Sequence, residues 1–382
     1  MKFFYSIIRY FKRVDKVLLF LVITASAYGC MLIYSATHTT GMRETIVQTA
    51  AIGLGLVIAI ILSLVDYEWL SKMWPVLAGI AIILMIVTLI WGVGPPGSNN
   101  KAWLVIPALN ISVQPSEFLK IVFIITFARH LQRVKDDINL FKTVIGLGLH
   151  AIIPFGLVLL TKDDGSATIF LVITICMLLA AGLSWKYFLA GGAAVAVAVP
   201  LLWFYYFDDF QRQRFLVVFN PEKYDPSGLT DYFQQLQSKI AIGSGQVIGQ
   251  GYLNGLRTQN GVVPKSYNDF ILTVAGEEFG FIGVIIVFAL LMAIFIRILW
   301  VGKRSHFSMG NMICVGIFAQ LGFQAVLNIG MCLALFPVIG VTLPFFSAGG
   351  SSMLALFISI GLVLSIYMHN EKRSAYDDGF RL

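Results

Sequence analysis

Three acidic residues in the last third of the chain have the types and spacing that could support chemistry. Glu277 and Glu278 are consecutive carboxylates inside an apolar, helix-like run, and Asp269 precedes that run after a stretch rich in Gly, Asn and Gln. A carboxylate at hydrocarbon depth costs roughly 2.5–3.5 kcal/mol, so it needs a partner, a wet cavity or a chemical role. At 1.5 Å per residue, the glutamates lie about 12 Å further along a helix than Asp269. We therefore expect Asp269 at the membrane surface, and we interpret Glu277 and Glu278 as structural groups or ligands of a water cavity.

Further polar residues precede these acids along the chain. Glu117 and Lys120 are three residues apart, so they share one helical face and can form an ion pair. That pair either lines a site or only fixes helix packing. Asp163 stands between Lys162 and Asp164, and its position fits an ordinary solvated loop as well as a site.

The elements that must position these residues are membrane spans. The chain is 58% hydrophobic and only 12% charged, whereas soluble globular proteins are typically about 25% charged. We predict an all-α polytopic integral membrane protein, with residues 1–382 forming one domain. About ten apolar runs are long enough to span a bilayer. They lie at residues 17–36, 45–65, 73–93, 116–132, 144–160, 167–184, 186–206, 271–299, 309–335 and 351–368.

The orientation follows from the Lys and Arg residues of the short loops, which concentrate on the cytoplasmic side of membrane proteins. Their distribution predicts that residues 1–16 form a cytoplasmic or interfacial N-terminus and that residues 369–382 form a cytoplasmic tail. Residues 207–268 then form a large extracellular loop between spans seven and eight. The net charge of +7 is explained by this asymmetry and gives no support for nucleic-acid binding.

Several familiar chemistries have no support in the sequence. The four cysteines lie in apolar spans without metal-ligand spacing. Gly243, Gly245 and Gly249 match neither a dinucleotide-binding loop nor a phosphate-binding loop. We expect neither ATP nor NAD, no protein-bound metal and no evident cofactor.

A set of motifs is spread over nearly the whole chain. They are Gln114-Pro115-Ser116-Glu117-Phe118-Leu119-Lys120, Asp163 with Gly165-Ser166-Ala167, Gln234 with Gln237-Ser238, Asp269-Phe270-Ile271, Gly276-Glu277-Glu278, Asn328-Ile329-Gly330-Met331 and Leu343-Pro344-Phe345-Phe346-Ser347. In this order the motifs resemble those of the family of shape, elongation, division and sporulation proteins, which includes the RodA and FtsW glycan polymerases. The short N-terminus and overall length are more similar to the RodA branch, with the division or sporulation branch as the alternative.

The resemblance implies a glycosyltransferase that polymerises lipid II into peptidoglycan strands during cell elongation. Glycosyl transfer would proceed with inversion and with release of undecaprenyl pyrophosphate. The enzyme would lie in the bacterial cytoplasmic membrane with its active site facing outward. The implied partners are lipid II, the nascent glycan strand, membrane lipids and a class B penicillin-binding protein that crosslinks the product.

The resemblance also assigns roles to residues. It implies that Asp269 is the catalytic residue, and general-base catalysis is typically worth about 10²–10⁴-fold. Basic residues would stabilise the leaving pyrophosphate electrostatically, and whether a divalent cation assists them is left open. The expected substrate-binding residues are Glu117, Lys120, Asp163, Arg212, Arg214, Gln234, Gln237 and Arg257.

One departure and two rival functions qualify this interpretation. Val263-Pro264-Lys265 stands where the family usually has Leu-Pro-Glu, so a base replaces an expected acid. The buried charged residues could instead form the path of a transporter or lipid II flippase, and a non-catalytic scaffold is a third alternative. Transporters usually bind at mid-membrane between inverted repeats. Here the polar residues cluster toward the outer face and no repeat is evident, which favours the enzyme.

Overall fold

The computed structural model describes residues 10, 12–39, 41–94, 100–106, 111–207, 209–227, 232–305 and 308–379. A long helix occupies each of the apolar runs predicted from the sequence. These helices are Lys16–Thr37 (α2), Arg43–Leu64 (α3), Trp74–Trp91 (α5), Pro115–Arg133 (α6), Phe141–Leu160 (α7), Asp164–Ala180 (α8), Trp185–Tyr205 (α9), Ile271–Lys303 (α14), Ser308–Cys332 (α15) and Gly350–Gly379 (α16).

Within the described residues, eight of these helices are long and apolar enough to cross a membrane. The other two are α8, which is shorter, and α6, which carries Glu117 and Lys120. The prediction of a mainly helical, multi-pass membrane protein is confirmed, whereas the count of ten spans stays a prediction. Much of the predicted N-terminal segment, residues 1–9 and 11, lies outside the described residues, as do residues 380–382 of the predicted tail.

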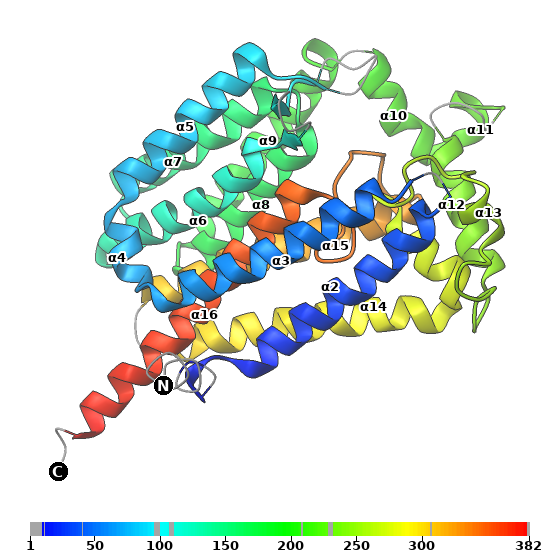
Figure 1. Cartoon of the computed structure of the whole chain (residues 1–382). Helices are drawn as coiled ribbons and strands as arrows, with labels where there is room; N and C mark the ends of the chain where they lie inside the picture. The colour runs from blue at the N-terminus through cyan, green and yellow to red at the C-terminus, as the bar shows by residue number, and fades with distance from the viewer. Residues whose placement is uncertain are drawn as a thin grey trace.

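Short elements connect the long helices. In Figure 1, α10 to α13 gather at one end of the bundle, away from the two chain termini. Two short strands, Leu104–Ile106 and Ile111–Val113, pair with each other, which an all-helical interpretation did not predict. Their β-branched residues favour extended backbone. The short elements are Tyr67–Lys72 (α4), Leu104–Ile106 (β1), Ile111–Val113 (β2, antiparallel to β1), Lys135–Asp137 (η1), Asp209–Phe219 (α10), Pro221–Tyr224 (α11), Phe233–Ser244 (α12) and Leu256–Gln259 (α13).

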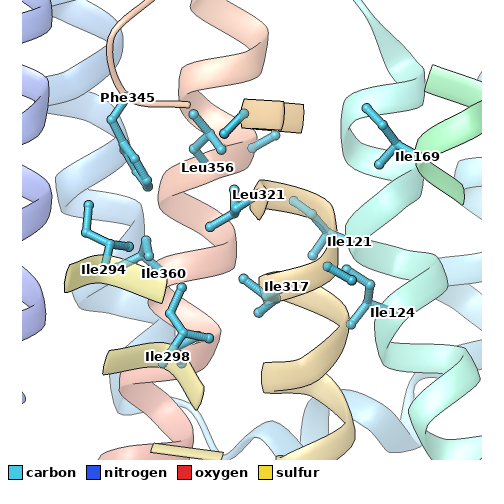
Figure 2. Packing of buried hydrophobic residues seen from close by; sticks show 14 of the residues in the cluster. Ile121, Ile124, Ile169, Ile294, Ile298, Ile317, Leu321, Phe345, Leu356 and Ile360 are labelled. Atoms are coloured by element: carbon cyan, nitrogen blue, oxygen red, sulfur yellow. The ribbon is translucent and has the colours of Figure 1, made fainter. Parts of the chain in front are cut away.

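Helix α15 lies at the centre of the apolar core. Figure 2 shows its Ile317 and Leu321 between Ile121 of α6 on one side and Ile294 of α14 on the other. A Cβ added at Gly316 of α15 would lie 2.8 Å from Ile124 Cγ2 of α6, so the two backbones approach closely at this level. Close-packed interiors yield little to small displacements. Helix α15 is therefore a rigid support for the residues at its C-terminal end.

Candidate active site

Asp269 lies two residues before α14 and is held in place through its backbone. The Asn328 side chain of α15 donates one hydrogen bond from Nδ2 to the Asp269 carbonyl (2.8 Å) and another to the Val341 carbonyl (2.7 Å). Cys332 Sγ, one turn further along α15, also donates to the Asp269 carbonyl at 3.5 Å. Both side chains are fully buried. The central helix of the core thus fixes the backbone from which the Asp269 carboxylate projects.

The environment of this carboxylate changes its chemistry. Desolvation by the surrounding protein raises the pKa of Asp269 to about 6, although the nearby Lys265 ammonium acts to lower it. Gly340 has a φ of +68°, and a Cβ added there would lie 3.8 Å from Asp269 Oδ2 while meeting no other described atom within 4 Å. Asp269 therefore adjoins unfilled space and can exchange a proton near neutral pH, as a general base must.

The segment between α15 and α16, residues 333–349, contacts Asp269 and one further predicted site residue, Arg214. Arg214 Nη1 approaches the Val338 carbonyl at 3.5 Å. At the start of α8, a Cβ added to Gly165 would lie 2.8 Å from Val341 Cγ2. Together with the contact of Gly340 at Asp269, these neighbours bring α8, α10 and α14 around one short piece of non-helical chain.

Asp163 is the N-cap of α8. Its Oδ1 accepts a hydrogen bond from the Ser166 N–H at 3.1 Å, and its Oδ2 accepts from Gln114 Nε2 at 2.8 Å and from Ser116 Oγ at 3.3 Å. Side-chain caps of this kind stabilise a helix by about 0.5–2 kcal/mol. The structure thus gives Asp163 a clear structural role beside α6, and its predicted role in substrate binding stays a prediction.

Glu117 and Lys120 form the pair that their spacing predicts. Lys120 Nζ lies 2.8 Å from Glu117 Oε1, and the two side chains are 0% and 6% exposed. Glu117 Oε2 is buried and has no hydrogen-bond partner among the described residues. The pair shares the cost of desolvation and leaves one acceptor oxygen without a partner.

The predicted residues of the long loop fall into two groups. Arg212 donates to the Trp203 carbonyl (2.9 Å) and the Phe204 carbonyl (3.1 Å) and pairs with Asp209 (3.1 Å), so it closes the end of α9. In contrast, Arg257 donates a hydrogen bond to Gln237 on α12.

Gln234 lies one turn before Gln237 on α12, and both are half-buried. The same helix packs on α14 and α15 near Asp269, where Ser238 Oγ lies 2.5 Å from Thr273 Oγ1 and donates to the Cys332 carbonyl at 2.9 Å. The fold therefore brings Arg257 and Gln237 together and leaves Arg212 at a helix end.

Sequence reasoning missed three residues at Asp269. Asn328 was noticed only as part of a motif, and no local signal showed that it would bond the Asp269 carbonyl. Lys265 was noted as a departure, although its position four residues before Asp269 could have marked it as the neighbouring cation. The sequence around Gly340 gave no signal, because its contribution to the site depends on its positive φ and on the space beside Asp269 that it leaves open.

Fold and site together define a multi-pass membrane protein with a buried ion pair and a carboxylate of raised pKa at one end of its helix bundle. More specifically, the chain belongs to the FtsW, RodA and SpoVE family of cell cycle proteins, whose family model matches residues 15–372. Peptidoglycan glycosyltransferase MrdB of Escherichia coli is 34% identical over 363 residues, which cover 94% of this chain and 95% of that protein. FtsW of Trichlorobacter lovleyi is 32% identical over 362 residues, covering 92% of each chain.

Solved structures show the same fold. A chain from a peptidoglycan synthase complex that coordinates polymerization and crosslinking superposes with a TM-score of 0.78 at 27% identity, covering 94% of this chain and 98% of that one. The rod shape determining protein RodA of Thermus thermophilus gives a TM-score of 0.69 at 26% identity, covering 93% and 96%.

Proposed function

We propose that this chain is a peptidoglycan glycosyltransferase that polymerises lipid II at the outer surface of the bacterial cytoplasmic membrane. The observation that carries the proposal is Asp269, a carboxylate of raised pKa that adjoins open space beside Gly340. It lies at the end of the bundle that the Lys and Arg distribution predicts to be outside. The reaction class is supported by the names of the relatives: MrdB is named a peptidoglycan glycosyltransferase, and FtsW is named a probable one.

The proposed reaction uses Asp269 as a general base. The 4-hydroxyl of an incoming lipid II sugar attacks the anomeric carbon of the growing strand, and a new carbon–oxygen bond forms. The bond from that carbon to the pyrophosphate oxygen breaks with inversion, and undecaprenyl pyrophosphate leaves with the electron pair. Asp269 accepts the hydroxyl proton, which is a step typically worth about 10²–10⁴-fold.

The remaining predicted residues would bind the two substrates. Arg257 and Arg214 are the cations proposed for the pyrophosphates, with Gln237 beside Arg257 and Gln234 one turn away from Gln237 on α12. The buried Glu117–Lys120 pair would form part of the wall of the site. The described residues contain no group of three or more His, Cys, Asp and Glu side chains that could hold a metal ion. A divalent cation, if the reaction uses one, would then be held largely by the pyrophosphate oxygens, and chelation with EDTA tests this point.

The cellular role that fits best is cell elongation and shape maintenance. The supporting comparisons are MrdB of Escherichia coli and the rod shape determining protein of Thermus thermophilus. The similar chain from a synthase complex supports a crosslinking partner, for which a class B penicillin-binding protein is the proposed type. A division or sporulation role is the alternative within the family.

Purified protein and lipid II provide the test. The wild-type chain should make glycan strands, and Asp269→Asn should reduce the rate by at least about 10²-fold because the base is lost. Because the folded-state pKa of Asp269, about 6, lies above its ordinary value of 3.8, ionisation of Asp269 lowers the stability of the folded state as the pH rises between these two values, and the full penalty applies at higher pH. Asp269→Asn removes this penalty, so its melting temperature at pH 8 should not fall.

Two outcomes would contradict the proposal. Polymerisation by a folded Asp269→Asn protein would remove Asp269 from the base role. Transport of lipid II across vesicles without any polymerisation by the wild type would instead support the flippase alternative.

A further inference from the structure

Glu277 and Glu278 have no part in the reaction proposed above, and yet they are adjacent carboxylates in the outer third of α14. Their exposed fractions are 0% and 1%. They lie eight and nine residues beyond Asp269, so they are too far along the helix to act as its chemical partner. What they contact is the part of the long loop that carries Arg257.

Glu277 binds the start of the short helix α13. Its Oε1 accepts the Arg257 backbone N–H at 2.8 Å. Its Oε2 accepts the Thr258 backbone N–H at 2.9 Å and the Thr258 hydroxyl at 2.6 Å. One buried carboxylate therefore satisfies three donors of α13, and hydrogen bonds to a charged acceptor are about twice as strong as neutral ones.

Glu278 binds the end of the same short helix and also α2. The Ser35 hydroxyl of α2 lies 2.6 and 2.7 Å from its two carboxylate oxygens, and Gln259 Nε2 donates to Oε1 at 2.8 Å. Gln259 Nε2 also lies 3.0 Å from Ser35 Oγ. Three elements thus meet at this carboxylate.

The backbone just before α13 is fixed to the same two residues. Gln250 N donates to the Glu277 carbonyl at 2.9 Å, and Gly251 N donates to the Glu278 carbonyl at 3.0 Å. A Cβ added at Gly255 would lie 2.8 Å from Glu278 Cγ and 3.0 Å from Glu277 Oε2, so only glycine leaves room for the approach. Both ends of the segment formed by residues 250–259 are therefore hydrogen-bonded to Glu277 and Glu278 of α14.

This anchoring decides where the Arg257 side chain lies. Its backbone is fixed by Glu277, and its guanidinium donates to the uncharged Gln237 side chain. The ion pairs of the described residues do not include Arg257. Its positive charge is therefore held in one place but not neutralised by an ion-pair partner.

We propose that Glu277 and Glu278 are positioning residues that hold Arg257 beside Gln237 as a preset cation for the pyrophosphate of the substrate. The inference rests on the proposed function for the ligand, but the anchoring itself does not. A preorganised charge stabilises a developing anion without reorganisation during the reaction. Glu277→Gln keeps the size of the side chain but loses its charge and replaces one acceptor oxygen by an NH₂ group, which cannot accept the α13 donors.

Hydrogen exchange of the full-length protein in detergent or nanodiscs tests the anchoring without any activity. In Glu277→Gln, the amides of Arg257 and Thr258 should exchange at least about tenfold faster, because their acceptor is weakened. A peptide from α12 should be unchanged. The matched control is Glu222→Gln, which removes an exposed carboxylate from α11 in the same loop and should alter neither peptide. Unchanged exchange at residues 257 and 258 would overturn the proposal.

Activity then tests whether the carboxylate acts through Arg257. Glu277→Gln and Arg257→Gln should each lower kcat/KM for lipid II, and the double variant should be no slower than Arg257→Gln alone. Independent effects that multiply would show that Glu277 does not act through Arg257. If Glu277→Gln fails to fold, Thr258→Val removes only the hydroxyl donor; it should give the same direction in both measurements, and no change in either would count against the proposal.

The two proposals fail in different ways. If the wild-type protein makes no glycan strands, the proposed function fails while the exchange experiment still tests the anchoring. If strands form but exchange at Arg257 and Thr258 is insensitive to Glu277→Gln, the function stands and the anchoring is wrong.

Discussion

At the scale of single residues, burial decides the chemistry of the site. Asp269 and the Glu117–Lys120 pair are all charged groups in a poorly solvated setting, and each meets that cost differently. Asp269 has a raised pKa, so it is neutral more readily than an ordinary aspartate. Glu117 and Lys120 instead stay paired at 2.8 Å. A raised pKa suits Asp269 as a group that must gain and lose a proton. A buried ion pair suits Glu117 and Lys120 as a fixed part of the wall of the site.

The first prediction concerns the pH dependence of polymerisation. A base must be ionised, so kcat/KM should fall as the pH drops through about 6, the pKa of Asp269. Lys265 acts to lower this pKa, so Lys265→Gln should move the acidic limb of the profile to higher pH. Lys265→Arg keeps the charge and is the control. An acidic limb that does not move in Lys265→Gln would show that Lys265 does not influence the ionising group.

The second prediction concerns the buried ion pair. Removing one partner leaves an uncompensated buried charge, so Glu117→Gln and Lys120→Met should each cost about 3–5 kcal/mol of stability. The double variant should lose clearly less than the sum, because no single charge is left behind. Thermal unfolding of the three purified variants measures this. Simple additivity would indicate that the two side chains contribute independently despite their contact.

At the scale of elements, the long loop and α14 are joined by backbone contact. Gly280 of α14 has a non-helical φ of +63°. At this kink, the Phe281 and Ile282 N–H groups donate to the Gln246 carbonyl (2.8 Å) and the Val247 carbonyl (3.2 Å). Backbone polar groups at membrane depth must be satisfied within the protein. The segment after α12 meets this requirement and fixes the helix that begins just after Asp269.

The third prediction compares two glycines near the end of α12. A Cβ at Gly245 would lie 1.9 Å from the Gly276 carbonyl oxygen, whereas a Cβ at Gly243 would meet nothing within 4 Å. Gly245→Ala should therefore push α12 from α14 and lower both the melting temperature and the polymerisation rate. Gly243→Ala should be neutral or stabilise by about 0.5–1 kcal/mol, since alanine favours helix. Equal effects of the two changes would contradict the packing described.

At the scale of the whole molecule, the two ends of the helix bundle carry different elements. One end carries α10 to α13, and the opposite end carries the start of α2 and the end of α16 (Figure 1). In the proposed reaction, the lipid substrate reaches the site from the bilayer and the product leaves on the outer side. The orientation of the chain in the membrane and its association with a crosslinking protein can both be tested.

The fourth prediction fixes the orientation. Single cysteines at the exposed positions Glu222, in α11, and Asp136, in η1, lie on opposite sides of the membrane in the proposed topology. A membrane-impermeant maleimide added to spheroplasts should label Glu222→Cys and leave Asp136→Cys unlabelled until the cells are permeabilised. The four native cysteines lie in long helices, and a variant without an added cysteine measures their background. The reverse pattern would invert the topology.

The fifth prediction concerns the crosslinking partner. Affinity purification of the chain from mildly solubilised native membranes should recover a single-span class B penicillin-binding protein, because a polymerised strand needs crosslinking. An unrelated multi-pass protein carrying the same tag is the control. A chain that is isolated alone and is fully active would argue against an obligate complex.

The sequence alone determined the membrane class, the ranges of the helices, the pairing of Glu117 with Lys120 and the family, and it drew attention to Asp269. These follow from patterns that are local in the chain, such as apolar length and the three-residue spacing of opposite charges. The motifs indicated the family because they occur in the family's order along nearly all of the chain.

Only the tertiary structure decided how these parts meet. Asn328 reaches the Asp269 carbonyl across 59 positions of chain, and Glu278 accepts a hydrogen bond from Ser35 across 243. Arg212 and Arg257 look alike in the sequence, but one closes the end of α9 and the other is held beside Gln237. Contacts between distant segments depend on how helices pack and how a loop folds back on them. No local pattern of residue types specifies that outcome.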